Sequence, residues 1–242
     1  VFLKGDLPIG VAPHSVDVWM APHLFHTEQS AGAPPDDFAA DGQNWGFPTY
    51  NWERMQEEGD FRWWRQRFER QARYFHAFRI DHILGFFRIW EVPRTQRSGL
   101  LGHFHPALPY SLEEWQEKLA LPFPIELLTA PLVHEDELTA RLGDSFDDLL
   151  DSGYLHSTAL AGLYQLTYGE QADYETEAVQ RALGADVAAV LAELCTETAL
   201  IADPYKAGHY HPRIALERSR LFARLPEELQ ERWRAVSDDY YY

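Results

Sequence analysis

The clearest periodic stretch of the chain runs from about Glu53 to Phe78. Its apolar residues recur every three or four positions with charged residues between them, which predicts an amphipathic helix. The segments on either side, Val1–Val11 and Phe78–Ile83, are short and apolar and predict strands. Strand, helix and strand in succession predict a parallel crossover unit within an α/β fold.

The segment between the first strand and the helix, residues 12–52, shows neither the helical nor the strand period of apolar residues. It is rich in Pro, Gly, Asp and Asn, with turn clusters at residues 32–36 and 42–46. This composition predicts one long irregular loop, and loops of that length in compact domains are usually functional.

After Pro109 the pattern changes to short helical stretches separated by Pro and Gly. Only residues 199–202 suggest a further strand. We therefore expect residues 1–108 to form one part of the structure and residues 109–242 to form a mostly helical insertion or subdomain. The four helices are predicted near residues 111–119, 135–150, 175–195 and 215–236.

Composition and charge exclude several classes of partner. The formal net charge of -17 repels nucleic-acid phosphates and anionic lipid, so we expect neither nucleic acid nor a membrane as a partner. No apolar run reaches the roughly 18 residues of a membrane helix. The single cysteine, Cys195, cannot form an internal disulfide and is expected to be a buried, inert thiol. These features predict a cytoplasmic location.

Two acidic residues, Asp6 and Asp81, directly follow apolar strand residues. Side chains at the carboxyl ends of parallel strands project toward the site of such folds. Arg79 precedes Asp81 by two positions, so on an extended strand both side chains point to one side, where the guanidinium would favour the ionised carboxylate. A purely structural ion pair is the alternative. His82 could bond a substrate hydroxyl or be an ordinary loop histidine.

Metal ligation finds little support in the sequence. The pairs His103/His105 and His209/His211 have spacings that could hold an ion on a strand, but neither pair has an obvious third ligand nearby. We therefore predict no metal site and no cofactor.

Five motifs occur in a characteristic order along the chain. They are Gly5-Asp6-Leu7-Pro8-Ile9, Ser15-Val16-Asp17-Val18-Trp19, Gly32-Ala33-Pro34-Pro35-Asp36, Gly42-Gln43-Asn44-Trp45-Gly46 and Arg79-Ile80-Asp81-His82. In these motifs the chain resembles 4-alpha-glucanotransferases of the amylomaltase or disproportionating-enzyme family, strongly so over residues 1 to about 110. The run Gly85–Pro93 resembles the plant cytosolic disproportionating enzyme and its bacterial relatives more than the short amylomaltases.

The resemblance implies part of a (β/α)8 TIM barrel with a largely helical insertion. It implies a retaining transfer of glucosyl units between alpha-1,4-glucans such as maltose, maltodextrin and glycogen or starch-like acceptors, with Asp81 as the nucleophile. Arg79 would steady Asp81, Asp6 would lie near the first sugar subsites and His82 would border the pocket. The other residues expected on the glucan path are Asp36, Phe38, Gln43 and Trp45, for which aromatic faces and hydrogen-bonding side chains give a physical rationale.

The sequence departs from the family at two points. Asp37 stands where the family commonly has Tyr, and the Glu-Asp-Leu-Gly motif that carries the family's general acid is absent between Arg79 and Tyr242. Glu91 is a carboxylate on the wrong element. Because retaining chemistry needs two carboxyl groups, and because the chain opens on Val1, we expect an internal fragment that is inactive alone. A non-catalytic glucan-binding protein and a hydrolase of the alpha-amylase group are the alternatives.

Overall fold

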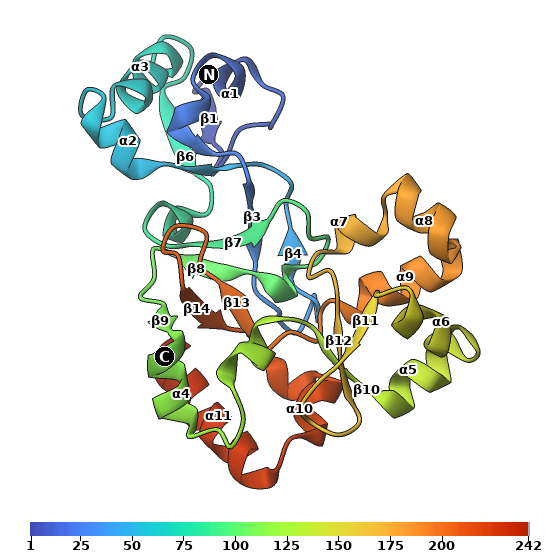
Figure 1. Ribbon diagram of the computed structural model, residues 1–242. Helices are drawn as coiled ribbons and strands as arrows, with labels where there is room; N and C mark the ends of the chain where they lie inside the picture. The colour runs from blue at the N-terminus through green and yellow to red at the C-terminus, as the bar shows by residue number, and fades with distance from the viewer. Residues whose placement is uncertain (242) are drawn as a thin grey trace.

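Residues 1–241 are described by a computed structural model in which helices surround several small sheets (Figure 1). The strands are β1 Lys4–Leu7, β2 Phe25–His26, β3 Gln29–Ala33, β4 Gln43–Asn44, β5 Thr49–Tyr50, β6 Ala77–Ile80, β7 Ile89–Pro93, β8 His103–His105, β9 Tyr110–Ser111, β10 Leu132–His134, β11 Leu155–Ser157, β12 Leu163–Leu166, β13 Leu200–Ala202 and β14 His209–Pro212. The α-helices are α1 Val16–Met20, α2 Trp52–Glu57, α3 Arg62–Gln71, α4 Leu112–Leu119, α5 Glu135–Leu142, α6 Ser145–Asp151, α7 Gln171–Tyr174, α8 Glu177–Leu183, α9 Ala185–Leu194, α10 Arg220–Arg224 and α11 Glu227–Tyr241. Short 3₁₀ turns are η1 Pro22–Leu24, η2 Ile83–Phe86, η3 Gly99–Leu101, η4 Ile125–Thr129 and η5 Leu216–Arg218. The fold mixes helix and sheet, as the sequence predicts.

The first crossover places β1 beside β6 as a parallel pair, with Asp6 opposite Arg79 and Leu7 opposite Ile80. The helices between them in sequence, α2 and α3, pack on the pair through a shared core that includes Leu7, Met55 and Trp64. The predicted strand–helix–strand unit is therefore confirmed. It brings the carboxyl ends of two strands that are distant in sequence to the same edge.

The helix predicted over residues 53–78 is wrong in two respects: it is two shorter helices, and the second ends at Gln71, before β6 begins at Ala77. The chain breaks between α2 and α3 at Gly59, Asp60 and Phe61, which all have positive φ. Arg65 holds this break together, since its guanidinium donates to the carbonyl oxygens of Gly59 and Asp60. Glycine enters positive φ without steric cost, and apolar periodicity carries no information about such a turn.

The prediction of one irregular loop over residues 12–52 is also wrong, because β3 lies inside a four-stranded antiparallel sheet ordered β4-β3-β7-β8 (Figure 1). β3 is buried from Gln29 to Gly32, yet its small residues show no apolar alternation. Its strand conformation follows from pairing with β7, which lies about sixty positions later in the sequence. Gly32 is required there, since a Cβ would lie 2.1 Å from the carbonyl oxygen of Gln43.

Residues 109–241 contain more strand than the sequence pattern suggests. Besides β13, which confirms the strand predicted at 199–202, they hold β9, β10, β11, β12 and β14 in two antiparallel three-stranded sheets. These strands have two to four residues, too few for an alternation to be read. Three of the predicted helices are divided, at Gly143, Gly184 and Pro226. Of the helices described here, none has both the length and the hydropathy needed to cross a bilayer.

Four clusters of buried apolar residues form the core. The two larger clusters lie within residues 110–236 and the two smaller ones within residues 7–89. The predicted boundary at residue 108 falls between these sets and stays a prediction. Polar contacts do cross that position, including the hydrogen bond from Tyr205 to Glu91 and the stacking of His103 on His211 at 4.2 Å between ring centroids.

The single cysteine provides a test of native packing. Cys195 is 0% exposed, and burial, followed by the negative charges of Asp173 and Glu170, raises the pKa of its thiol to about 12. At pH 8 only about one native thiol in ten thousand is then ionised, and the thiolate is the reactive form. We expect 5,5′-dithiobis(2-nitrobenzoate) to label the folded chain at least about 10³-fold more slowly than the urea-unfolded chain. Equal rates would contradict this packing.

Candidate active site

Asp81 is the first residue after β6 and is exposed at the carboxyl end of that strand. Its backbone N–H donates to the carbonyl oxygen of Leu7 at 3.0 Å, so the β1–β6 ladder extends one residue beyond the strands themselves. The main chain of Asp81 is thus fixed while its carboxylate remains open to solvent. This is the arrangement required of a side chain that must reach a substrate.

Arg79 forms its hydrogen-bonded ion pair with Asp6 instead of Asp81. Nε and one Nη donate to the two carboxylate oxygens of Asp6 at 2.7 and 2.8 Å, a two-point contact across the parallel strands. The hydrogen bond and charge of Asp6 raise the pKa of Arg79, and the charge of Asp81 adds a smaller contribution in the same direction. Arg79 therefore links Asp6 to the neighbourhood of Asp81.

The reason for this choice of partner lies in the pairing register. Arg79 stands directly opposite Asp6 on the neighbouring strand. Directly opposed residues on paired strands are closer than residues two apart along one strand, which lie nearly 7 Å apart. The sequence supplied the three charged residues but not the register.

His82 begins the turn after β6 and adopts a left-handed conformation with φ 49°. Its ring packs edge-on against Trp45, with 5.3 Å between ring centroids. The indole N–H of Trp45 in turn donates to Gln43 Oε1 at 2.8 Å. A Cβ on Gly85 would lie 2.5 Å from His82 Cδ2, so glycine at that position leaves space for the imidazole. The structure thus brings Gln43, Trp45 and His82 together, and His82 directly follows Asp81 in the chain.

Asp36 and Phe38 belong to the turn between β3 and β4. Asp36 Oδ1 accepts hydrogen bonds from the backbone N–H groups of Phe38 and Ala39 at 2.8 and 2.7 Å, which stabilises the turn. The ring of Phe38 is 97% exposed. Asp36 has a structural role in shaping this turn, and Phe38 is the side chain that the turn presents to solvent.

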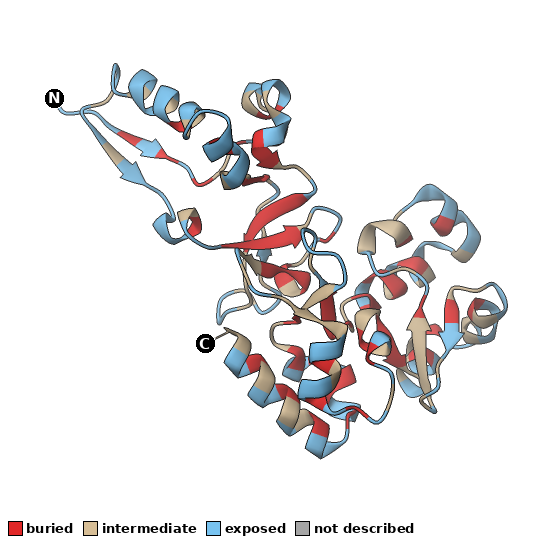
Figure 2. Ribbon diagram, turned by 60° about the vertical axis from the view of Figure 1, so that its left-hand side comes forward, coloured by how far each residue is buried: buried red, intermediate tan, exposed pale blue. Residues whose placement is uncertain are grey.

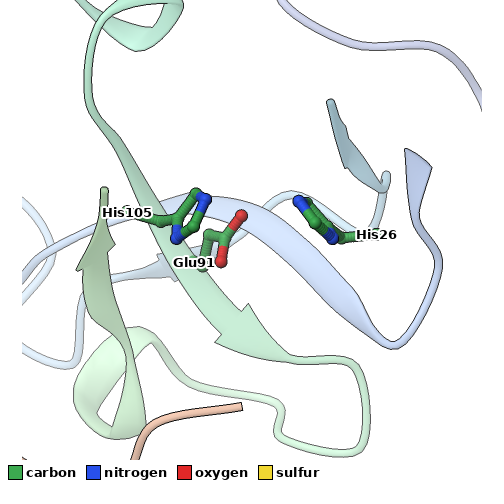
Figure 3. Close-up of side chains that lie close together, drawn as sticks. All are labelled: His26, Glu91 and His105. Atoms are coloured by element: carbon green, nitrogen blue, oxygen red, sulfur yellow. The ribbon is translucent and has the colours of Figure 1, made fainter. Parts of the chain in front are cut away.

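A second cluster of polar side chains was missed by the sequence interpretation. His26 on β2, Glu91 on β7 and His105 on β8 converge (Figure 3). Glu91 is fully buried, and burial raises the pKa of its carboxyl group against the opposing effects of His105 and of the hydrogen bonds from Thr49 and Tyr205. Burial, reinforced by His105, lowers the pKa of His26 to about 4, so this imidazole is neutral at neutral pH. No spacing signal could reveal the cluster, because three separate strands supply its members.

Comparison with known proteins places the chain by family. The 4-alpha-glucanotransferase family model matches residues 1–203. Rice (Oryza sativa subsp. japonica) 4-alpha-glucanotransferase DPE2 is 36% identical over the whole chain, which corresponds to 26% of the rice protein. The Chlamydia pneumoniae 4-alpha-glucanotransferase is 43% identical over 37% of the chain and 17% of its own length. This chain belongs to the 4-alpha-glucanotransferase family.

Structural comparison is more limited in extent. The amylomaltase from Streptococcus agalactiae in complex with acarbose matches 44% of this chain and 22% of its own with 38% sequence identity and a TM-score of 0.41. The chain therefore spans only a minor part of the relatives that it matches. The predicted resemblance to the family is confirmed by the sequence matches.

Proposed function

We propose that this chain carries the nucleophile side of a retaining 4-alpha-glucanotransferase site that moves glucosyl units or longer alpha-1,4-glucan segments between glucans. The observation that carries the proposal is the Arg79-Ile80-Asp81-His82 motif at the carboxyl end of a parallel strand, in a chain that belongs to the family. Asp81 is exposed there, the charged pair of Arg79 and Asp6 interacts with it electrostatically, and the neighbouring His82 packs against Trp45.

We further propose that β1 and β6 are neighbouring strands of a (β/α)8 barrel, with residues 109–242 as the insertion. Two features support this. The pair is parallel and connected through helices, and much of the ribbon beside the N-terminus is pale blue, hence exposed (Figure 2). The exposed apolar residues along and beside the pair include Phe2 at 90% and Ile80 at 45%. A two-stranded parallel pair with uncovered apolar side chains is unusual in isolation, because parallel sheets are normally covered on both faces.

The proposed transfer proceeds in two displacements, for which this chain supplies the nucleophile. Asp81 attacks the anomeric carbon of a donor glucan, and the bond to the leaving sugar breaks as a second carboxyl group protonates the departing oxygen. The second carboxyl group, now deprotonated, takes the proton of an acceptor hydroxyl, whose oxygen displaces Asp81 from the anomeric carbon and restores the original configuration. The second carboxyl group is not assigned to any residue of this chain. The Arg79–Asp6 ion pair sets the electrostatic potential around the Asp81 carboxylate.

The glucan path would run over Gln43, Trp45 and His82 toward the Asp36–Phe38 turn. Aromatic faces pack on the CH faces of sugars, and amide and imidazole groups orient their hydroxyls. Trp45 offers an indole that is held by Gln43 and His82 and is still partly exposed. Phe38 offers an almost entirely free ring. Maltose or maltodextrin as donor and glycogen-like glucan as acceptor, in the cytoplasm, complete the proposal.

The test is glucose release from maltose by the full-length product of the gene that encodes this chain, with and without glycogen. We expect release that depends on the acceptor, with glucosyl units incorporated into glycogen. Acceptor-independent hydrolysis to glucose would contradict transfer and indicate a hydrolase. Glucan binding without turnover would indicate a non-catalytic binding protein.

A further inference from the structure

Three strands bring together an imidazole pair and a carboxylate that the proposed transfer does not use. One ligand atom from each of His26, Glu91 and His105 lies within 4.8 Å of the other two. Figure 3 shows Glu91 extending between the two histidine rings. Two imidazoles and one carboxylate form a donor set that zinc uses when three protein side chains bind it.

Glu91 is held ready for a cation by its own hydrogen bonds. Its two oxygens accept from Thr49 Oγ1 at 2.5 Å and from Tyr205 Oη at 2.7 Å. Each oxygen keeps a further lone pair, and no Lys or Arg among residues 1–241 forms an ion pair with this fully buried carboxylate. A buried carboxylate without a cation is costly, and hydrogen bonds to a carboxylate ligand are the usual outer contacts of a metal site.

The ring nitrogens of the two histidines are available to bind a metal ion. Neither ring makes a hydrogen bond within residues 1–241, and both are only partly buried, so a solvent ion could reach them. Their rings pack edge-on at 5.5 Å between centroids and flank Tyr205 at 4.7 and 4.5 Å. The register explains the placement of His26, which lies opposite Thr49, the residue that donates to Glu91.

We propose that His26, Glu91 and His105 bind a divalent transition-metal ion of the zinc class, with water completing the coordination. Thr49 and Tyr205 orient the carboxylate. Since Tyr205 lies between β13 and β14 whereas the three ligands lie on β2, β7 and β8, its hydrogen bond to Glu91 links the site to the later part of the chain. Its role is structural, at a place distinct from Asp81.

The test uses tag-free protein, because a polyhistidine tag binds zinc. After chelator treatment and dialysis, zinc is titrated in competition with a chromophoric chelator, and bound metal is counted by mass spectrometry. We expect one equivalent per chain, a zinc-dependent rise in the unfolding temperature and a four- or five-coordinate visible spectrum with Co²⁺. Less than about a tenth of an equivalent with no thermal shift would overturn the proposal.

Variants locate the site. His26→Ala and His105→Ala are each expected to lower zinc affinity at least about 100-fold, and Tyr205→Phe about 10-fold to 100-fold. His14→Ala is the matched control, because His14 is exposed and outside the cluster, and it should leave affinity unchanged. The Glu91→Gln variant is interpreted only after circular dichroism has shown that it is folded. Unchanged stoichiometry and affinity in the His26→Ala, His105→Ala double variant would place the metal elsewhere and overturn the proposal.

Discussion

Replacing Asp81 by Asn in the full-length protein is expected to lower the rate of glucan transfer by about 10⁴-fold or more. The carboxamide has the shape of the carboxylate but is a far weaker nucleophile, so no covalent intermediate forms. The Arg79–Asp6 pair and the backbone bond from Asp81 to Leu7 do not depend on that carboxylate. The variant should therefore fold normally. Initial rates of glucose release from maltose with glycogen, together with the unfolding temperature, measure both effects.

The matched control is Asp151→Asn, an exposed carboxylate at the end of α6, which should retain full activity. Chemical rescue sharpens the assignment. With Asp81→Gly and an activated alpha-glucoside, azide should restore turnover and yield a beta-glucosyl azide, because it attacks from the face that Asp81 occupied. Substantial transfer by Asp81→Asn would show that another group is the nucleophile.

Trp115→Ala is expected to destabilise the chain by about 3–5 kcal/mol, the range for removing a fully buried large aromatic side chain. Trp115 is 0% exposed within the largest core cluster and stacks on Trp233 with 5.9 Å between centroids. Its indole N–H donates to the carbonyl of Tyr210 at 3.1 Å, so the substitution also removes that donor. Urea unfolding followed by circular dichroism measures the change.

Trp19→Ala is the control for this substitution. Trp19 is 79% exposed, and surface substitutions usually change stability by less than about 0.5 kcal/mol. Similar losses in the two variants would mean that the cluster around Trp115 contributes little to stability. A loss confined to Trp115→Ala would support the cluster as the core of residues 110–236.

The sequence predicted those parts of the fold that depend on contacts between residues close together in the chain, and failed where distant segments pair. Apolar periodicity was sufficient for the crossover, because α2, α3 and the adjoining strands contribute apolar residues to one shared cluster. It failed for β3, whose small residues acquire strand structure only by pairing with β7. It also failed at Gly59–Phe61, where backbone conformation and the guanidinium of Arg65 divide one apolar stripe into two helices.

The candidate sites likewise depend partly on local sequence and partly on long-range contacts. The sequence by itself determined the family and the motif that contains Asp81, because motifs and their order can be read along the chain without knowledge of its fold. Only the tertiary structure decided that Arg79 pairs with Asp6, that Trp45 contacts His82, and that His26, Glu91 and His105 meet. The physical reason is that strand register and the approach of separate sheets set these distances, and neither is encoded in the spacing of residues along one strand.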